Sequence, residues 1–300
     1  MRATAAASIN PVKATSIGLP FLYFLLFFVG PLIYLGLLGF WTVDNFSIVP
    51  SFSLANYAEI ASNLTSGSKY GFAIAQTLYV SSTTAILAVL VCYPMALAVA
   101  YAVPERYQRL IVLLSVAPFW TSYILRVYAW QVLLAKRGVI NSLLAYAGLG
   151  NLHLDILYTQ TATRIGLVHY LAPILIVILY ISVRNVDGTL IEAARELGAS
   201  RRQVLTRVIL PLTRPGIILS LSFAALVACG DVLSGSILGG GAGESVLGKL
   251  PLYANLVIRA YASSTNLPHT AAMAIVLVAL MLLIVAVGLG IGERTRIAVR

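Results

Sequence analysis

Three of the ionisable residues in or near the ends of apolar stretches long enough to cross a membrane are candidates for solute binding or proton relay: Arg126, His169 and Asp231. A charged group in lipid is costly, so it usually faces a cavity or a partner group, where it can bind a solute or relay a proton. Asp231 admits three interpretations. It caps or pairs with the glycine-rich exit of its helix, it lines a pathway and attracts a cationic solute, or it belongs to a proton relay.

The surroundings of Arg126 and His169 leave alternatives open as well. Arg126 follows the aromatic run from Pro118, which contains Trp120 and Tyr123. This run is typical of an aromatic belt with an arginine that snorkels to the interface, or it forms one wall of a solute pathway. His169 is either a packed, hydrogen-bonded residue or a participant in transport. The candidates for a translocation path are therefore Trp120, Tyr123, Arg126, His169 and Asp231.

The composition indicates an all-α polytopic membrane protein. Of the 300 residues 60% are hydrophobic and only 10% are charged, and the mean hydropathy is +0.92, whereas soluble domains carry about 25% charged residues. The net charge of +10 could suggest a nucleic-acid partner, but the basic residues cluster at the ends of apolar stretches, so we expect none. Both cysteines, Cys92 and Cys229, lie in apolar stretches, and we expect no disulfide and no metal site.

Six apolar stretches reach the length of about 20 residues that a transmembrane helix needs. They are Gly18–Trp41, Phe72–Val103, Leu110–Trp130, Thr161–Val183, Pro215 to about Leu238, and Ala271–Gly290. We expect an N-terminal segment 1–16, a six-span domain over 17–291 with a polar loop at 185–214, and a tail at 292–300. Thirteen of the 20 lysines and arginines then fall on the side of the two termini and the polar loop, which predicts that all three are cytoplasmic.

The polar loop has the pattern of two short helices joined by a glycine. Thr189 and Glu192 have the spacing of a capping box, and so do Ser200 and Gln203. Gly198 stands where a left-handed helix cap is expected. One helical face is shared by Leu190, Ala193, Ala194 and Leu197. Two adjacent alanines allow another protein's backbone to come close, although an amphipathic hairpin lying on the lipid surface fits the same pattern.

The spacing in this loop resembles the EAA loop of ABC-importer permeases. Glu192-Ala193-Ala194 is followed after three residues by Gly198 and later by Leu210-Pro211, with Val208 where the family has isoleucine. The resemblance implies a coupling helix that docks on a cytoplasmic ATPase through Glu192, Ala193, Ala194, Leu197, Gly198 and Ser200. The runs Pro118–Trp130 and Gly230–Leu250 also resemble the spermidine/putrescine-type branch of the family.

This resemblance implies the type I importer permease fold and a permease subunit in a bacterial inner membrane. Its partners would be a second permease subunit, giving a heterodimer, two ATP-binding subunits, a periplasmic solute-binding protein and membrane lipid. Its solute would be a polyamine-like cation or a related small organic molecule. No catalysis and no cofactor are expected on this chain: Gly243–Lys249 looks like part of a phosphate-binding loop, but Leu250 replaces the residue that would hold magnesium. The alternative is a secondary transporter driven by an ion gradient.

Overall fold

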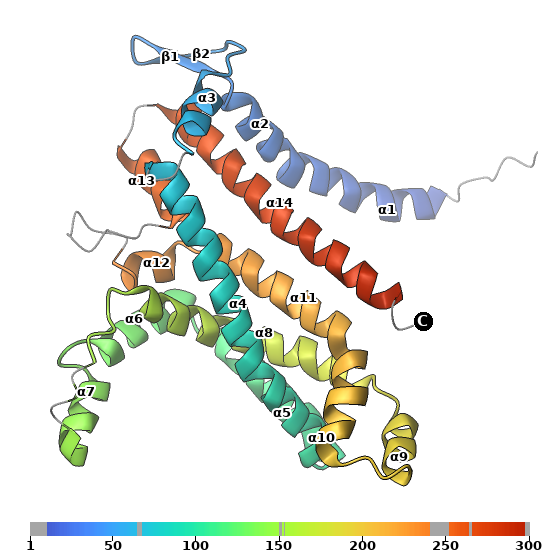
Figure 1. The fold of residues 1–300 in the computed structure, drawn as a ribbon. Helices are drawn as coiled ribbons and strands as arrows, with labels where there is room; N and C mark the ends of the chain where they lie inside the picture. The colour runs from blue at the N-terminus through green and yellow to red at the C-terminus, as the bar shows by residue number, and fades with distance from the viewer. Residues whose placement is uncertain are drawn as a thin grey trace, which may run out of the picture. The chain divides into compact units, whose positions relative to one another are not determined.

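The computed structural model describes residues 11–64, 68–149, 152, 154–240, 252–263 and 266–297 of the chain. These residues are mainly helical (Figure 1). The α-helices are α1 (Pro11–Phe24), α2 (Gly30–Leu38), α3 (Ala55–Ser62), α4 (Lys69–Ala102), α5 (Glu105–Val116), α6 (Tyr123–Leu134), α7 (Val139–Leu144), α8 (Gln160–Arg184), α9 (Gly188–Glu196), α10 (Arg201–Val204), α11 (Leu210–Cys229), α12 (Leu233–Ile237), α13 (Tyr253–Ser263) and α14 (Leu267–Ile297).

Shorter elements join some of these helices. They are the π-helical turns η1 (Leu25–Val29), η3 (Ala145–Leu149) and η4 (Leu205–Ile209), the 3-10 turn η2 (Ala117–Trp120), and the strands β1 (Thr42–Asp44) and β2 (Ser47–Val49). The two strands pair antiparallel around Asn45 and Phe46, whose φ angles are 46° and 61°. A two-residue hairpin of this kind favours glycine or asparagine at both positions. Phe46 hides that signal, so the all-α prediction missed the hairpin.

Six helical stretches among the described residues are long and apolar enough to cross a membrane, which confirms the predicted number. They are Gly18–Leu38, Lys69–Ala102, Tyr123–Leu149, Gln160–Arg184, Arg201–Cys229 and Leu267–Arg294. Four of them agree with the predicted spans to within a few residues at each end. The third and the fifth differ from the prediction.

The predicted third span, Leu110–Trp130, is not one helix. Helix α5 ends at Val116, the 3-10 turn η2 follows, and the backbone is extended at Thr121 before α6 begins at Tyr123. Pro118 explains the break, because proline removes a hydrogen bond and clashes with the preceding turn of an α-helix. The stretch with spanning length and composition therefore starts at Tyr123.

The fifth span begins earlier than predicted and also ends earlier. Helix runs from Arg201 through α10, η4 and α11 to Cys229, so Pro215 lies inside α11 and not in a first turn. The wider π-helical turn η4 directly precedes Pro211, where the missing amide of proline would otherwise interrupt a regular helix. Beyond Cys229 the chain turns, and the short helix α12 covers part of what was predicted as span.

Two compact units divide the chain: one contains residues 1–62 and 260–276, and the other contains residues 63–259 and 277–300. In the larger unit α4, α8 and α11 pack together through a cluster of small and branched residues: Ala85, Ala88, Cys92, Ala96, Leu171, Leu175, Leu179 and Ala224. Small residues allow membrane helices to approach closely. Gly216 on α11 is an example, because a Cβ atom there would collide with the Ser182 side chain on α8.

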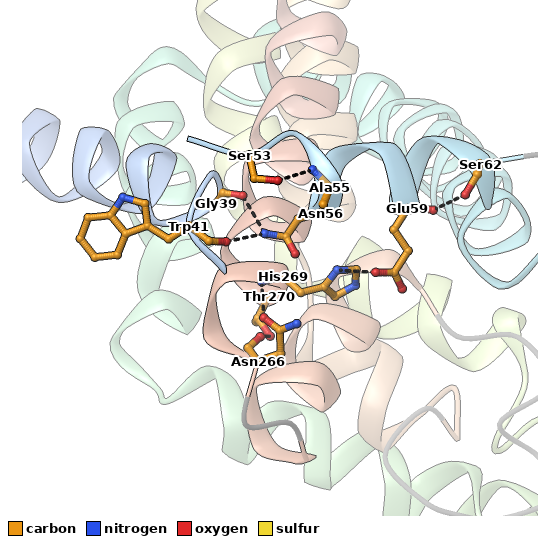
Figure 2. Close-up of polar contacts among 10 residues, drawn as sticks. All are labelled: Gly39, Trp41, Ser53, Ala55, Asn56, Glu59, Ser62, Asn266, His269 and Thr270. Atoms are coloured by element: carbon orange, nitrogen blue, oxygen red, sulfur yellow. Dashed lines mark hydrogen bonds and ion pairs between the residues drawn. The ribbon is translucent and has the colours of Figure 1, made fainter. Parts of the chain in front are cut away.

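The smaller unit is organised by a polar network around α3 (Figure 2). The Asn56 amide donates hydrogen bonds to the carbonyl oxygens of Gly39 and Trp41, at 3.0 and 2.9 Å. Glu59, one turn further along α3, lies 3.5 Å from His269 at the start of α14. These contacts join the end of α2 and the start of α14 to the same short helix.

Candidate functional site

The first helix of the polar loop starts at a different residue from the one predicted. The Asp187 carboxylate accepts a hydrogen bond from the Thr189 amide at 3.0 Å, and α9 begins at Gly188. Thr189 is thus inside the helix, and the predicted capping box of Thr189 and Glu192 is wrong. The hydrogen bonds from Thr189 favour the charged carboxylate and lower the pKa of Asp187 below its ordinary value.

The glycine turn and the second cap are as predicted. Gly198 has φ +80°, and the amides of Gly198 and Ala199 bond back to the carbonyls of Arg195 and Ala194, at 2.9 and 3.0 Å. This is the pairing of a helix that ends on a left-handed glycine. The Ser200 hydroxyl accepts from the Gln203 amide at 3.3 Å, and the Gln203 side chain accepts from the Ser200 amide at 2.8 Å. The turn is therefore held by hydrogen bonds on both sides.

Helix α9 divides its side chains between two surroundings. Ile191 is buried and forms a cluster with Val204 and Ile209, against which Leu97 of α4 and Ala194 pack. The opposite side of α9 is exposed: it carries Glu192, Ala193 and Leu197, and the Leu197 side chain is 89% exposed. Of the two adjacent alanines, only Ala193 thus belongs to the fully exposed surface.

Asp231 lies beyond the end of α11 and is 8% exposed. Its carboxylate accepts hydrogen bonds from the amides of Ser234 and Gly235, at 2.9 and 3.2 Å, and from the Tyr123 hydroxyl at 2.5 Å. The Tyr123 hydroxyl also bonds the Ser234 hydroxyl at 2.7 Å. The amides at the start of the short helix α12 thus donate to the Asp231 carboxylate, which is a contact of the capping or pairing kind in the first interpretation.

Arg126 lies one turn along α6 from Tyr123, among aromatic rings. Its guanidinium carbon is 5.2 Å from the ring centre of Tyr170, 5.5 Å from that of Phe119 and 5.9 Å from that of Tyr123. These distances are typical of cation–π contacts. The Nε and Nη1 atoms are buried and have no hydrogen-bond partner among the described residues. The arginine is thus held among the aromatic rings of its own chain and does not simply extend to water.

Comparison with known proteins identifies the family. Residues 9–296 match the family described as binding-protein-dependent transport system inner membrane component. The chain belongs to this family. It is an ABC-importer permease.

Curated relatives of this permease include spermidine/putrescine permeases. The chain is 32% identical to the spermidine/putrescine transport system permease protein PotB of Haemophilus influenzae, over 89% of this chain and 90% of the relative. It is 32% identical to PotB of Escherichia coli strain K12, over 80% of this chain and 86% of the relative. It is also 28% identical to the inner membrane ABC transporter permease protein YdcU of the same strain, over 86% and 82% of the two chains.

Solved structures confirm the fold of the permease. A bacterial ABC transporter that imports the acidic polysaccharide alginate contains a chain that superposes with a TM-score of 0.72 at 18% identity, over 94% of this chain and 95% of that one. An inward-facing MetNI methionine ABC transporter gives a TM-score of 0.56 at 16% identity, over 77% and 99% of the two chains. The predicted importer permease fold is therefore correct.

The structure brings together some of the predicted path residues of the permease. Tyr123 bonds Asp231, and Arg126 lies above the Tyr123 ring. His169 packs edge-on against Trp130, with ring centres 5.7 Å apart. Trp120 is 84% exposed, and no described contact links it to this cluster. Tyr123, Arg126 and Asp231 therefore lie in one cluster, and His169 on α8 packs against α6 at Trp130.

Three members of this cluster were not among the predicted path residues: Tyr170, Ser234 and Phe119, the last of which lies in the predicted aromatic run. Ser234 had a local signal, because it stands three residues after Asp231 at the start of a short helix. Tyr170 had none, since its contact with Tyr123, at 4.2 Å between ring centres, joins residues of different helices. Among the described residues no group of histidine, cysteine, aspartate and glutamate side chains could hold a metal ion. Residues 241–251, which include the sequence like a phosphate-binding loop, lie outside the described residues.

Proposed function

We propose that this permease couples ATP hydrolysis to solute import by docking helix α9 on a cytoplasmic ATPase subunit. The observation that carries the proposal is the exposure of Leu197 on a helix whose start and end are both fixed. A large apolar residue that is 89% exposed at the C-terminal end of α9, within a polar loop, is suited to a protein partner. On the same surface, Ala193 would let the backbone of the ATPase approach closely, and Glu192 supplies a charge.

The inner surface of α9 supports transmission of the coupling motion. Ile191 packs with Ile209 of η4, within the fifth span, and Leu97 of α4 packs against the same cluster. A displacement of α9 by the ATPase would therefore act directly on two spanning helices. Coupling of this kind needs contacts that differ between the inward-open and outward-open states.

The remaining subunits follow from the family and from the solved transporters. We propose two ATP-binding subunits below the membrane, a second and different permease subunit within it, and a periplasmic solute-binding protein above. The description of the family as binding-protein-dependent supports the last of these, and one related structure is a transporter in complex with its periplasmic protein. We place both termini and α9 in the cytoplasm of a bacterium, with the chain in the inner membrane.

The solute we propose is a polyamine-like cation or a related small organic solute, on the strength of the spermidine/putrescine relatives. Asp231 supplies little support for a cation site, because its two oxygens already accept three hydrogen bonds. The family membership favours ATP-driven import over the ion-gradient-driven alternative. In this proposal Tyr123, Arg126 and Asp231 shape the path, and the binding protein selects the solute.

The decisive experiment replaces Leu197 by aspartate in the full complex. We expect the ATPase subunit to be lost on co-purification and uptake into proteoliposomes to fall at least tenfold, because a charge would be buried without a partner at the interface. Leu54→Asp, a change at another exposed leucine, is the control and should keep the ATPase. Equal retention of the ATPase by both variants would refute the docking role of α9.

A further inference from the structure

A basic pocket lies between the start of α5 and the end of α8, apart from the residues discussed above. It has a volume of about 550 Å³ and is lined by three arginines, Arg106, Arg109 and Arg184, and by one acid, Glu105. Arg184 forms an ion pair with Glu105 at 2.8 Å. Arg106 and Arg109 are exposed and have no acidic partner among the described residues. The pocket therefore carries a net positive charge.

The wall between these arginines is fixed by a buried side chain. Gln108 is 4% exposed, and its amide nitrogen donates to the carbonyls of Ala100 and Val103, at 3.1 and 2.9 Å. Its amide oxygen accepts from the Tyr180 hydroxyl at 2.9 Å. The turn between α4 and α5 is thus tied to α8, and Gln108 itself offers the pocket no free donor.

Exposed leucines follow both arginines along α5, and the Arg106 guanidinium lies 4.6 Å from the ring centre of Tyr107. Leu110 and Leu114 follow Arg106 at four-residue intervals and are 51% and 59% exposed, and Leu113 follows Arg109 and is 64% exposed. Residues four apart on a helix lie on the same side, one turn above the other. The pocket therefore has a cationic end that continues into an apolar surface.

We propose that this pocket binds an anionic phospholipid. Its phosphate lies between Arg106 and Arg109, whose guanidinium groups match phosphate oxygens in pairs, and its acyl chains lie along Leu110, Leu113 and Leu114. Basic pockets at the ends of membrane helices bind lipid headgroups in this manner. A free phosphate ion would satisfy the arginines but leave the leucine rows uncovered. The inference goes beyond transport and requires only that the chain spans a membrane.

The test measures lipid retention by the complete transporter after detergent washing, with phosphatidylglycerol and phosphatidylcholine as probes in native mass spectrometry. The wild type should retain phosphatidylglycerol selectively. Arg106→Gln/Arg109→Gln should weaken its binding roughly twenty-five-fold, at about fivefold for each arginine removed. The control Lys136→Gln/Arg137→Gln removes the same charge at two exposed residues of another segment and should retain the lipid. Equal retention by the two double variants overturns the proposal.

Two further arms separate lipid from free anion. Glycerol phosphate has the headgroup chemistry without acyl chains, and it should not displace bound phosphatidylglycerol at the same concentration. Leu110→Ser/Leu114→Ser should weaken phosphatidylglycerol binding while both arginines remain. Displacement by glycerol phosphate, or unchanged binding in the serine variant, would identify a free-anion site and overturn the proposal. If the glutamine variant does not fold, Arg106→Lys/Arg109→Lys keeps the charge and should bind the lipid more weakly than the wild type, because ammonium groups lose the paired geometry.

Discussion

Replacement of Gly198 by valine tests whether the turn after α9 depends on its backbone conformation. Gly198 has φ +80°, and no other atom lies within 4 Å of the position that a Cβ would take. The cost of a side chain there is therefore conformational and not steric: roughly 1–2 kcal/mol for a residue other than glycine, with β-branched valine at the upper end. This cost raises the population of the opened turn about five- to thirtyfold.

Hydrogen exchange of the α9 and α10 amides measures that population directly. We expect exchange in the valine variant to accelerate by the same factor, together with a loss of solute-stimulated ATP hydrolysis in the complex. Gly198→Asn should stay closer to the wild type, because asparagine tolerates the left-handed region better than other side chains do.

Gly188→Ala is the matched control for this experiment. Gly188 is the first residue of α9, also has open space around its Cβ position, and has no positive φ. Alanine there should leave exchange unchanged or slow it slightly, since alanine favours helix by up to about 1 kcal/mol over glycine. If Gly198→Val and Gly188→Ala behave alike, the argument from backbone strain is wrong.

Two further predictions concern aspartates that accept backbone amides. Asp231→Asn keeps an oxygen that can accept from the amides of Ser234 and Gly235, so uptake and melting temperature should stay near those of the wild type. Asp231→Leu should lower the melting temperature, because each buried donor left unpaired costs about 1–3 kcal/mol. A normal melting temperature with lost uptake in the asparagine variant would contradict this structural role. The pKa of Asp187 is lowered by the Thr189 hydrogen bonds, so its cap is complete at neutral pH and is lost as the pH falls below about 4, through the lowered pKa. The protection of the first-turn amides of α9, taken relative to the intrinsic exchange rate at each pH, should fall over that acid range in the wild type but not in Asp187→Asn; protection of the wild type that does not change with pH would argue against the cap.

Local chemistry made parts of the loop predictable from sequence. Gly198 and the Ser200–Gln203 box depend on contacts within a few residues, and both are present. The start of α9 was misplaced because Asp187 and Thr189 are both good caps two residues apart. Sequence spacing alone does not choose between them. In the structure the helix that begins at Gly188 buries Ile191 against Val204 and Ile209, and these contacts come from outside the helix.

For the membrane helices too, some features follow from the local sequence and others from distant contacts. The number of spans follows from apolar length, which the sequence carries in full. The break at Pro118 had a local signal that the span prediction did not use. In the fifth span the local signal was misleading. Proline usually ends a helix, but here the helix continues through Pro211 and Pro215, and the π-helical turn η4 accommodates the first of them. The contact between Tyr170 and Tyr123 is set by the packing of α8 on α6. The sequence near either residue therefore gives no sign of it.

The unbroken helix from Arg201 to Cys229 has a mechanical consequence. Its 29 residues run from the Ser200 cap at one end to Asp231 just past the other, and the helix changes direction between α10 and the far end of α11 (Figure 1). The π-helical turn η4 and the prolines Pro211 and Pro215 lie along this course and are the usual causes of such a bend. The capped turn that faces the ATPase in our proposal and the hydrogen-bonded cluster of Tyr123 are thus joined by one continuous helix, with no loop between them.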